Sequence, residues 1–180
     1  MVTALVPFFS GDSPVAHSDR EKRWNFLDLC LDSLVGFADR IIVGVCEDLI
    51  FPYTDAGVEF LFCEPEFLPA TFFRKMQGRL SLGDLVYCSE ADQVLHWSEE
   101  ALEGVSESDF LVPYRFERNI KQENGFGGGF LASVDLFKRV SFSNAEFSPI
   151  EHSMYWDVRK VADPFQVDSF WVDHLSGVVE

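Results

Sequence analysis

Two carboxylates one residue apart, Glu90 and Asp92, are the side chains of this sequence best placed to do chemistry. They follow residues 85–88, a short and wholly apolar run with the pattern of a strand buried on both faces. Side chains two residues apart in extended backbone point the same way at roughly 6–7 Å, so both carboxylates can reach one cation. Ligands of open α/β sheets bind just beyond the carboxyl ends of the strands. The stretch therefore predicts a site for a metal ion and a diphosphate.

The same acid-x-acid pattern also arises by chance in so acidic a chain. Thirty of the 180 residues are Asp or Glu, and about five such triplets are expected at random. Three others are present, at Asp19-x-Glu21, Glu64-x-Glu66 and Glu107-x-Asp109. An acidic loop without a ligand is therefore the competing interpretation, and the position of Glu90 and Asp92 after a buried strand is what favours the metal site.

Composition limits the classes of protein that remain. A chain of 180 residues that is 47% hydrophobic, with no linker and no internal repeat, fits a single domain over residues 1–180. Fourteen basic against 30 acidic residues give a net charge of −16, which repels a phosphate backbone and argues against nucleic acid as a partner. A bound diphosphate would therefore need a local cation or a local basic cluster.

Nothing in the sequence predicts a membrane span or a signal peptide. No run of about eighteen apolar residues occurs, and the N-terminal residues lack a basic region and reach Pro7 early. The four cysteines are widely spaced within apolar runs, which favours buried thiols over two disulfides. We therefore expect a cytoplasmic protein, and the sequence leaves a homo-oligomer open.

The order of the apolar segments predicts a single-domain, three-layer α/β/α fold with a mainly parallel, Rossmann-like mixed sheet. A capping box, Ser18-x-x-Glu21, begins a first helix that ends near Gly36, and Pro69 stands in the first turn of a second. Strands are expected at 3–9, 41–46, 58–63, 85–88, 109–116, 130–131 and 165–172, and further helices at 68–78, 99–102, 134–140 and 155–161.

These motifs, taken in order, resemble those of GT-A-type glycosyltransferases, which have the nucleotide-diphospho-sugar transferase fold. The resemblance covers nearly the whole chain, although each motif is short. The matching segments are the strand end Pro7-Phe8-Phe9, the acids Glu47-Asp48, the acid-x-acid motif Glu90-Ala91-Asp92-Gln93, the glycine-rich segment 127–137 that enters a helix, and the late pair Asp173-His174.

The resemblance implies metal-dependent transfer of a sugar from a nucleotide-diphosphate-sugar to the hydroxyl of a carbohydrate or other acceptor. Asp92 and Glu90 would hold Mn²⁺ or Mg²⁺, with His174 as a third ligand, and the imidazole tilts the choice toward Mn²⁺. The ion would stabilise charge on the departing diphosphate. Asp92 would be the direct ligand, while Glu90 would contact the ribose, or the metal through water.

The resemblance also implies donor-binding roles for residues outside the metal motif, each with a structural alternative. Aromatic residues at the first strand end would flank the nucleotide base, or pack in the core. A basic helix side chain would face the diphosphate, or lie in solvent. The acids after the second strand would hydrogen-bond the base or the ribose, or form a simple acidic turn. Glycines would let the backbone approach the donor, or form a plain loop. The residues concerned are Pro7, Phe8, Phe9, Glu47, Arg74, Gly128 and Gly129.

The catalytic base is the least defined part. The family's late acidic motif has no clean match, and Glu151 and Asp157 are the nearest candidates, which the sequence does not separate. If neither faces the anomeric carbon, a retaining mechanism becomes the better prediction. A noncatalytic nucleotide-binding or interaction protein is an alternative, favoured by the short chain. A nucleotidyltransferase would call for a basic, glycine-rich loop after the first strand, where Ser10-Gly11-Asp12 offers no Lys or Arg.

Overall fold

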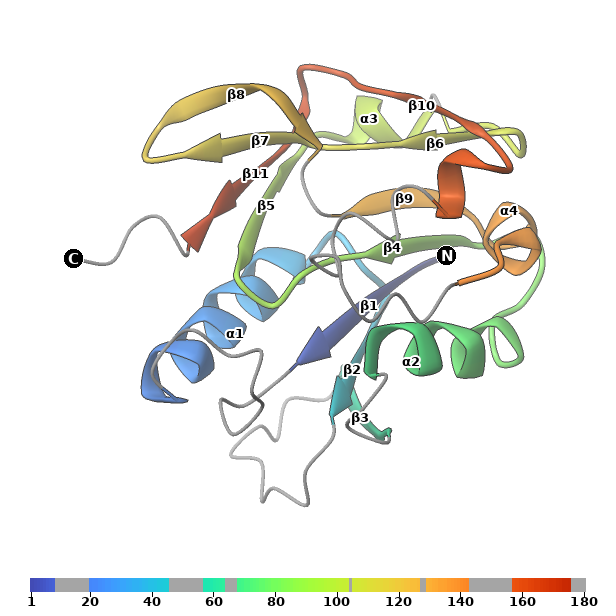
Figure 1. Ribbon diagram of the computed structural model, residues 1–180, viewed down its shortest axis with the longest axis horizontal. Helices are drawn as coiled ribbons and strands as arrows, with labels where there is room; N and C mark the ends of the chain where they lie inside the picture. Colours follow the sequence, from blue (N-terminus) through green and yellow to red (C-terminus); the bar gives the residue numbers. More distant parts are fainter. Residues whose placement is uncertain are drawn as a thin grey trace.

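The computed structural model describes residues 1–8, 20–45, 57–63, 68–103, 105–126, 129–142 and 157–175 (Figure 1). The helices are α1 (Arg20–Leu34), α2 (Leu68–Gln77), α3 (Glu99–Glu103) and α4 (Val134–Arg139). The strands are β1 (Val2–Phe8), β2 (Arg40–Val45), β3 (Val58–Phe62), β4 (Leu85–Cys88), β5 (Gln93–Trp97), β6 (Asp109–Leu111), β7 (Tyr114–Glu117), β8 (Ile120–Phe126), β9 (Phe130–Ser133), β10 (Asp163–Phe165) and β11 (Phe170–His174).

Seven strands form one mixed sheet in the order β10-β6-β9-β4-β1-β2-β3. The pairs β3–β2, β2–β1, β1–β4 and β6–β10 are parallel, whereas β9 runs antiparallel to both β4 and β6. From β1 the chain adds β2 and β3 on one side and then returns to place β4 on the other. The order of strands therefore reverses between β1 and β4, which is where open α/β sheets bind their ligands.

Helices cover both faces of this sheet. Successive side chains of a strand point to opposite faces, so the apolar residues of a central strand pack against helices on both sides. On β1, Leu5 packs with the buried residues of α2 and α4, whereas Ala4 and Val6 pack with those of α1. Figure 1 shows α1 on one side of β1 and α2 on the other. Strands β1, β2 and β4 are almost wholly apolar because both of their faces are buried, whereas β3, at the edge of the sheet, is partly exposed and carries Glu59. The predicted fold class, α/β with a mainly parallel mixed sheet, is confirmed.

The second sheet has four strands in the order β5-β11-β7-β8. Its inner face joins the core on the α1 side through Leu95, Phe170 and Val172, all of them buried. The outer face is half-exposed, and there His96 stacks on Trp171 with ring centroids 3.6 Å apart. This alternation of buried and half-exposed residues is typical of a sheet with one face on the core and the other in solvent.

The second sheet accounts for the main differences from the sequence prediction. Residues 109–116, expected as one strand, form β6 in the large sheet and β7 in the small one, separated by Val112 and Pro113. Residues 165–172, also expected as one strand, are divided between the end of β10 and β11. Strands β5 and β8 were not predicted at all. The cause is physical, because an apolar run shows that a segment is extended but not which sheet it joins.

Among the described helices, none combines the length and the apolar character that a membrane span needs. That residues 1–180 form a single domain stays a prediction.

Candidate metal centre

The end of β4 sets the position of Glu90. The amide of Ser89 donates to the carbonyl of Leu5 at 3.0 Å, which extends the β1–β4 pairing one residue past the strand. The carbonyl of Glu90 then accepts hydrogen bonds from the Ser89 hydroxyl (3.1 Å) and from the Cys30 thiol of α1 (3.4 Å). Burial raises the pKa of Cys30 to about 12, with a smaller contribution from the negative charge of Asp92. The thiol therefore stays protonated and remains a donor.

A tight turn between β4 and β5 places Asp92 beside the second sheet. Its carbonyl accepts a 2.8 Å hydrogen bond from the amide of Leu175, which follows β11. The side-chain amide of Gln93 donates to the Glu90 carboxylate at 2.7 Å. Glu90 is thus held at its carbonyl by Cys30 of α1 and at its carboxylate by Gln93 of β5, and Asp92 is held at its carbonyl by the residue that follows β11.

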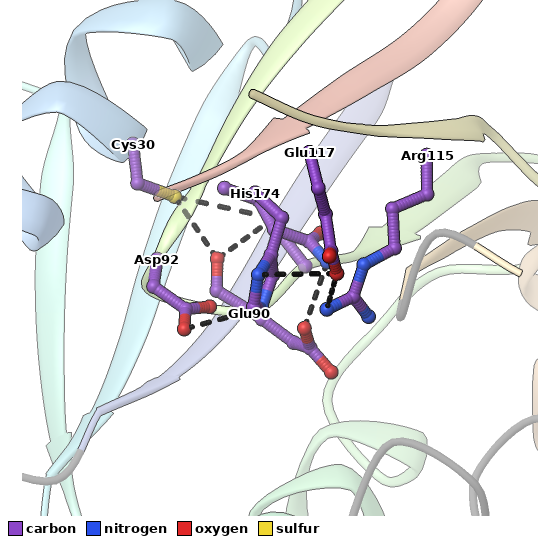
Figure 2. Close-up of polar contacts among 8 residues, drawn as sticks. Cys30, Glu90, Asp92, Arg115, Glu117 and His174 are labelled. Atoms are coloured by element: carbon purple, nitrogen blue, oxygen red, sulfur yellow. Dashed lines mark hydrogen bonds and ion pairs between the residues drawn. The ribbon is translucent and has the colours of Figure 1, made fainter. Parts of the chain in front are cut away.

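His174 brings the third donor from the end of β11. Its Nε2 atom lies 3.4 Å from Oδ2 of Asp92, and its side chain is only 7% exposed. One ligand atom each from Glu90, Asp92 and His174 can be chosen so that all three lie within 4.8 Å of one another. Figure 2 shows these side chains converging between the two sheets. We call this set the metal trio.

The metal trio offers two carboxylates and an imidazole. Carboxylate oxygens suit Mg²⁺ and Mn²⁺, and an imidazole nitrogen favours the softer Mn²⁺. The spacing of the three donors is compatible with one ion held between them. The structure therefore brings together the three residues that the sequence singled out, while their function as ligands stays a prediction.

Arg115 and Glu117 of β7 adjoin the metal trio and were missed by the sequence analysis. Oε1 of Glu117 lies 3.9 Å from Nδ1 of His174 and 2.8 Å from a terminal nitrogen of the Arg115 guanidinium. The signal that could have found them is the alternation Arg115-Phe116-Glu117, which puts both charged side chains on one face of a strand. Sequence reasoning had instead looked to Arg74 for a cation at the site.

The predicted base-binding residues of β1 lie in the core. Phe8 is 2% exposed and packs edge-to-face against Trp24, with ring centroids 4.8 Å apart. Pro7 is also buried and pairs with Gly44 of β2. Arg74 lies on α2, which packs on the face opposite to the second sheet, and its Nε atom donates to the carbonyl of Ala70 in its own helix. These contacts support the structural alternative for all three predicted residues.

Gly129 lies against the end of β4 for a steric reason. A Cβ atom at this position would come within 2.6 Å of the Cys88 carbonyl oxygen and 3.2 Å of the Tyr87 hydroxyl. The absence of a side chain is thus explained by the close packing of the strand that carries the metal motif. The other predicted donor-binding and catalytic residues, Phe9, Glu47, Gly128 and Glu151, lie outside the described residues.

Asp157 lies at the opposite end of the strands from the metal trio. It belongs to a helical stretch, residues 157–159, that leads into β10. Figure 1 shows this orange-red turn beside α4, away from the connection between β4 and β5. The residue is only 3% exposed, and its carboxylate accepts a 2.7 Å hydrogen bond from the ammonium of Lys160. The structure does not bring Asp157 to the metal trio, and its position does not favour the predicted function as general base.

No family model matches the chain, and no curated protein matches it. Three solved structures illustrate its similarities. A protein of Mycobacterium tuberculosis, Rv0371C, solved in complex with manganese, aligns with a TM-score of 0.59 at 13% identity over 92% of this chain and 87% of its own. The 2-C-methyl-D-erythritol 4-phosphate cytidylyltransferase of Francisella tularensis aligns at 0.54 and 13%, over 92% and 89%. The inositol-1-phosphate CTP transferase of T. maritima aligns at 0.52 and 15%, over 96% and 88%.

These identities are too low to carry an activity from one protein to another, but the similarity extends over nearly the whole of each chain. Two of the three proteins are named as nucleotidyltransferases that use CTP, and none is named as a glycosyltransferase. The narrower expectation of a glycosyltransferase therefore stays a proposal. What the geometry and the comparisons establish together is that the chain has the nucleotide-diphospho-sugar transferase (GT-A-like) fold.

Proposed function

We propose that the protein is a metal-dependent transferase that takes a nucleotide-diphosphate-sugar and passes its sugar to an acceptor hydroxyl. The observation that carries the proposal is the metal trio, in which Glu90, Asp92 and His174 converge beyond the carboxyl end of β4. This position is adjacent to the reversal of strand order between β1 and β4, where the fold class binds its ligands.

In this proposal Asp92 and His174 ligate Mn²⁺ or Mg²⁺, and Glu90 completes the shell or contacts the ribose. A bound ion supplies Lewis-acid stabilisation of charge on the departing diphosphate. The chain itself supplies orientation, since Gln93 holds the Glu90 carboxylate and Leu175 holds the turn that carries Asp92. With a net charge of −16, the protein as a whole repels a diphosphate, which makes a local cation necessary.

For the general base on the acceptor hydroxyl we retain Glu151. Asp157 is the weaker candidate because its carboxylate is buried and bound to Lys160 at the far end of the strands. A base that accepts the hydroxyl proton as the sugar transfers would give inversion at the anomeric carbon. Glu151→Gln should then lower the turnover of sugar transfer at least 100-fold while leaving nucleotide binding unchanged.

A nucleotidyltransferase is the second candidate, and the structural neighbours are the observation in its favour. Such an enzyme would also use a metal ion on the phosphates, but it would consume a nucleoside triphosphate and release pyrophosphate. The sequence Ser10-Gly11-Asp12 after β1 favours the first candidate, because it offers no Lys or Arg to a triphosphate.

The two candidates are separated by thermal shift and product analysis. The protein is titrated with UDP, GDP, CTP and the common UDP- and GDP-sugars, each with and without Mn²⁺. We expect stabilisation by a nucleotide diphosphate or its sugar only in the presence of Mn²⁺, its loss in Asp92→Ala, and slow hydrolysis of one nucleotide-sugar. Stabilisation by a triphosphate, with release of pyrophosphate from that triphosphate when a sugar phosphate is added, would support the nucleotidyltransferase. Indifference to every nucleotide would support the noncatalytic alternative.

A further inference from the structure

The imidazole of His174 lies between two carboxylates on opposite sides of the ring. Nε2 is 3.4 Å from Oδ2 of Asp92, and Nδ1 is 3.9 Å from Oε1 of Glu117. The His174 side chain is 7% exposed, so these neighbours rather than solvent determine how the ring is oriented. Figure 2 shows Glu117 approaching His174 from the side away from Asp92.

Glu117 is itself held by its neighbour on the strand. The guanidinium of Arg115 contacts Oε1 of Glu117 at 2.8 Å, and the Arg115 side chain is only 16% exposed. Strand β7 runs parallel to β11, with Arg115 opposite Val172 and Phe116 opposite Asp173. Glu117 therefore follows in register beside the end of β11, and the backbone pairing of the second sheet fixes its approach to the histidine.

We propose that Glu117, oriented by Arg115, is a positioning residue that holds His174 with its Nε2 lone pair toward the metal ion. An imidazole that ligates a metal through one nitrogen carries its proton on the other, and a carboxylate near that nitrogen favours this tautomer and ring orientation. Because Oε1 of Glu117 is near Nδ1, the Glu117 carboxylate faces the proton that Nδ1 would carry. The inference deepens the proposed function, on which it rests, and adds two residues of β7 to the site.

The test is Mn²⁺ binding to the purified protein, measured by isothermal titration calorimetry. Removing an outer-shell partner of a ligating histidine weakens metal affinity about 10–100-fold. We expect a loss in that range for Glu117→Ala, a smaller loss for Glu117→Gln, whose amide oxygen can still accept a hydrogen bond from the ring, and the smallest loss for Glu117→Asp. Glu59→Gln is the matched control, because Glu59 is an exposed carboxylate on β3 that pairs with Arg40 instead.

A second readout separates positioning from general damage to the fold. Pulsed electron paramagnetic resonance of bound Mn²⁺ detects the coupling to an imidazole nitrogen, which we expect in the wild type and expect to be altered in Glu117→Gln at an unchanged melting temperature. Unchanged coupling and affinity within threefold of wild type in both Glu117→Ala and Glu117→Gln would overturn this inference alone, provided that Asp92→Ala still abolishes binding. A wild-type protein that binds no Mn²⁺ would overturn the metal centre and this inference together.

Discussion

The two sheets of this protein differ in what their residues contribute. The seven-stranded sheet is buried on both faces between α1 and the pair α2 and α4, and it supplies the metal motif only at the tip of β4. The four-stranded sheet is buried on one face and supplies His174, Arg115 and Glu117 from the strands that border the site. The difference teaches that stability is concentrated in the first sheet, whereas the candidate site is completed by the second.

The strongest way to break this comparison is to truncate one aromatic residue that packs on each sheet. Phe72 of α2 is fully buried against the large sheet, and its ring lies over Gly44. Phe72→Ala should lower the free energy of unfolding by about 3–5 kcal/mol, because it removes buried apolar area and leaves a cavity. Phe116→Ala, at a half-exposed position of β7, should cost roughly 1 kcal/mol. Urea denaturation monitored by circular dichroism measures both, and equal losses would contradict the comparison.

A glycine pair sharpens the comparison at the border of the site. Gly129→Ala puts a methyl group within 2.6 Å of the Cys88 carbonyl oxygen, so the end of β4 must move. We expect a loss of about 1–3 kcal/mol in the free energy of unfolding. Gly57→Ala is the matched control, since a Cβ atom there meets nothing within 4 Å, and it should change stability by less than about 0.5 kcal/mol. A neutral Gly129→Ala would show that β4 tolerates displacement next to the metal motif.

The pH dependence of stability offers a smaller effect tied to the large sheet. A thiol in the unfolded chain ionises near pH 8.5, whereas burial raises the pKa of Cys30 to about 12. The unfolded state therefore loses its proton first, so the contribution of Cys30 to stability is constant below about pH 8 and falls as the pH rises toward 12. Cys30 should contribute a loss of about 1–2 kcal/mol by pH 10.

Chemical denaturation at pH 7, 9 and 10 measures this slope, with Cys30→Ser as the comparison variant. The variant should show a smaller slope but not a flat line, because burial also raises the pKa of Cys88 and of Tyr87. Identical slopes in the two proteins would mean that Cys30 is not held protonated as the structure indicates.

The strands of the first half of the large sheet could be predicted because each is recognisable from the residues of its own segment. Apolar runs predict β1, β2, β3 and β4 to within a residue or two of their observed bounds, and for β1, β2 and β4 the reason is that a strand buried on both faces is largely apolar. The metal motif followed from the same reasoning, because the polarity changes abruptly where β4 ends. Residues 90 and 92 were thus found from position and residue type, and His174 from a resemblance.

The second sheet could not be predicted in the same way because its strands are short, polar on one face and paired over long distances. Strand β5 pairs with β11, some eighty residues further along the chain, and no pattern in either segment identifies the other. Residues 109–116 are divided between two sheets at Pro113. A proline in a strand pattern indicates an edge strand or an interruption, but it does not indicate that the chain passes from one sheet to another. Glu117 escaped notice for this reason, since its importance appears only when β7 lies beside β11.

The central claim is that one metal ion is held jointly by the two sheets. Mn²⁺ titration of the wild type, Asp92→Ala, His174→Ala and the double variant tests it most directly. We expect the wild type to bind one ion. Each single variant should lose Mn²⁺ affinity by at least the factor of about 10–100 that the loss of an outer-shell partner causes. The double variant should bind Mn²⁺ as weakly as the weaker-binding single variant, because both ligands serve the same ion. Wild-type affinity in His174→Ala would contradict a centre that spans both sheets.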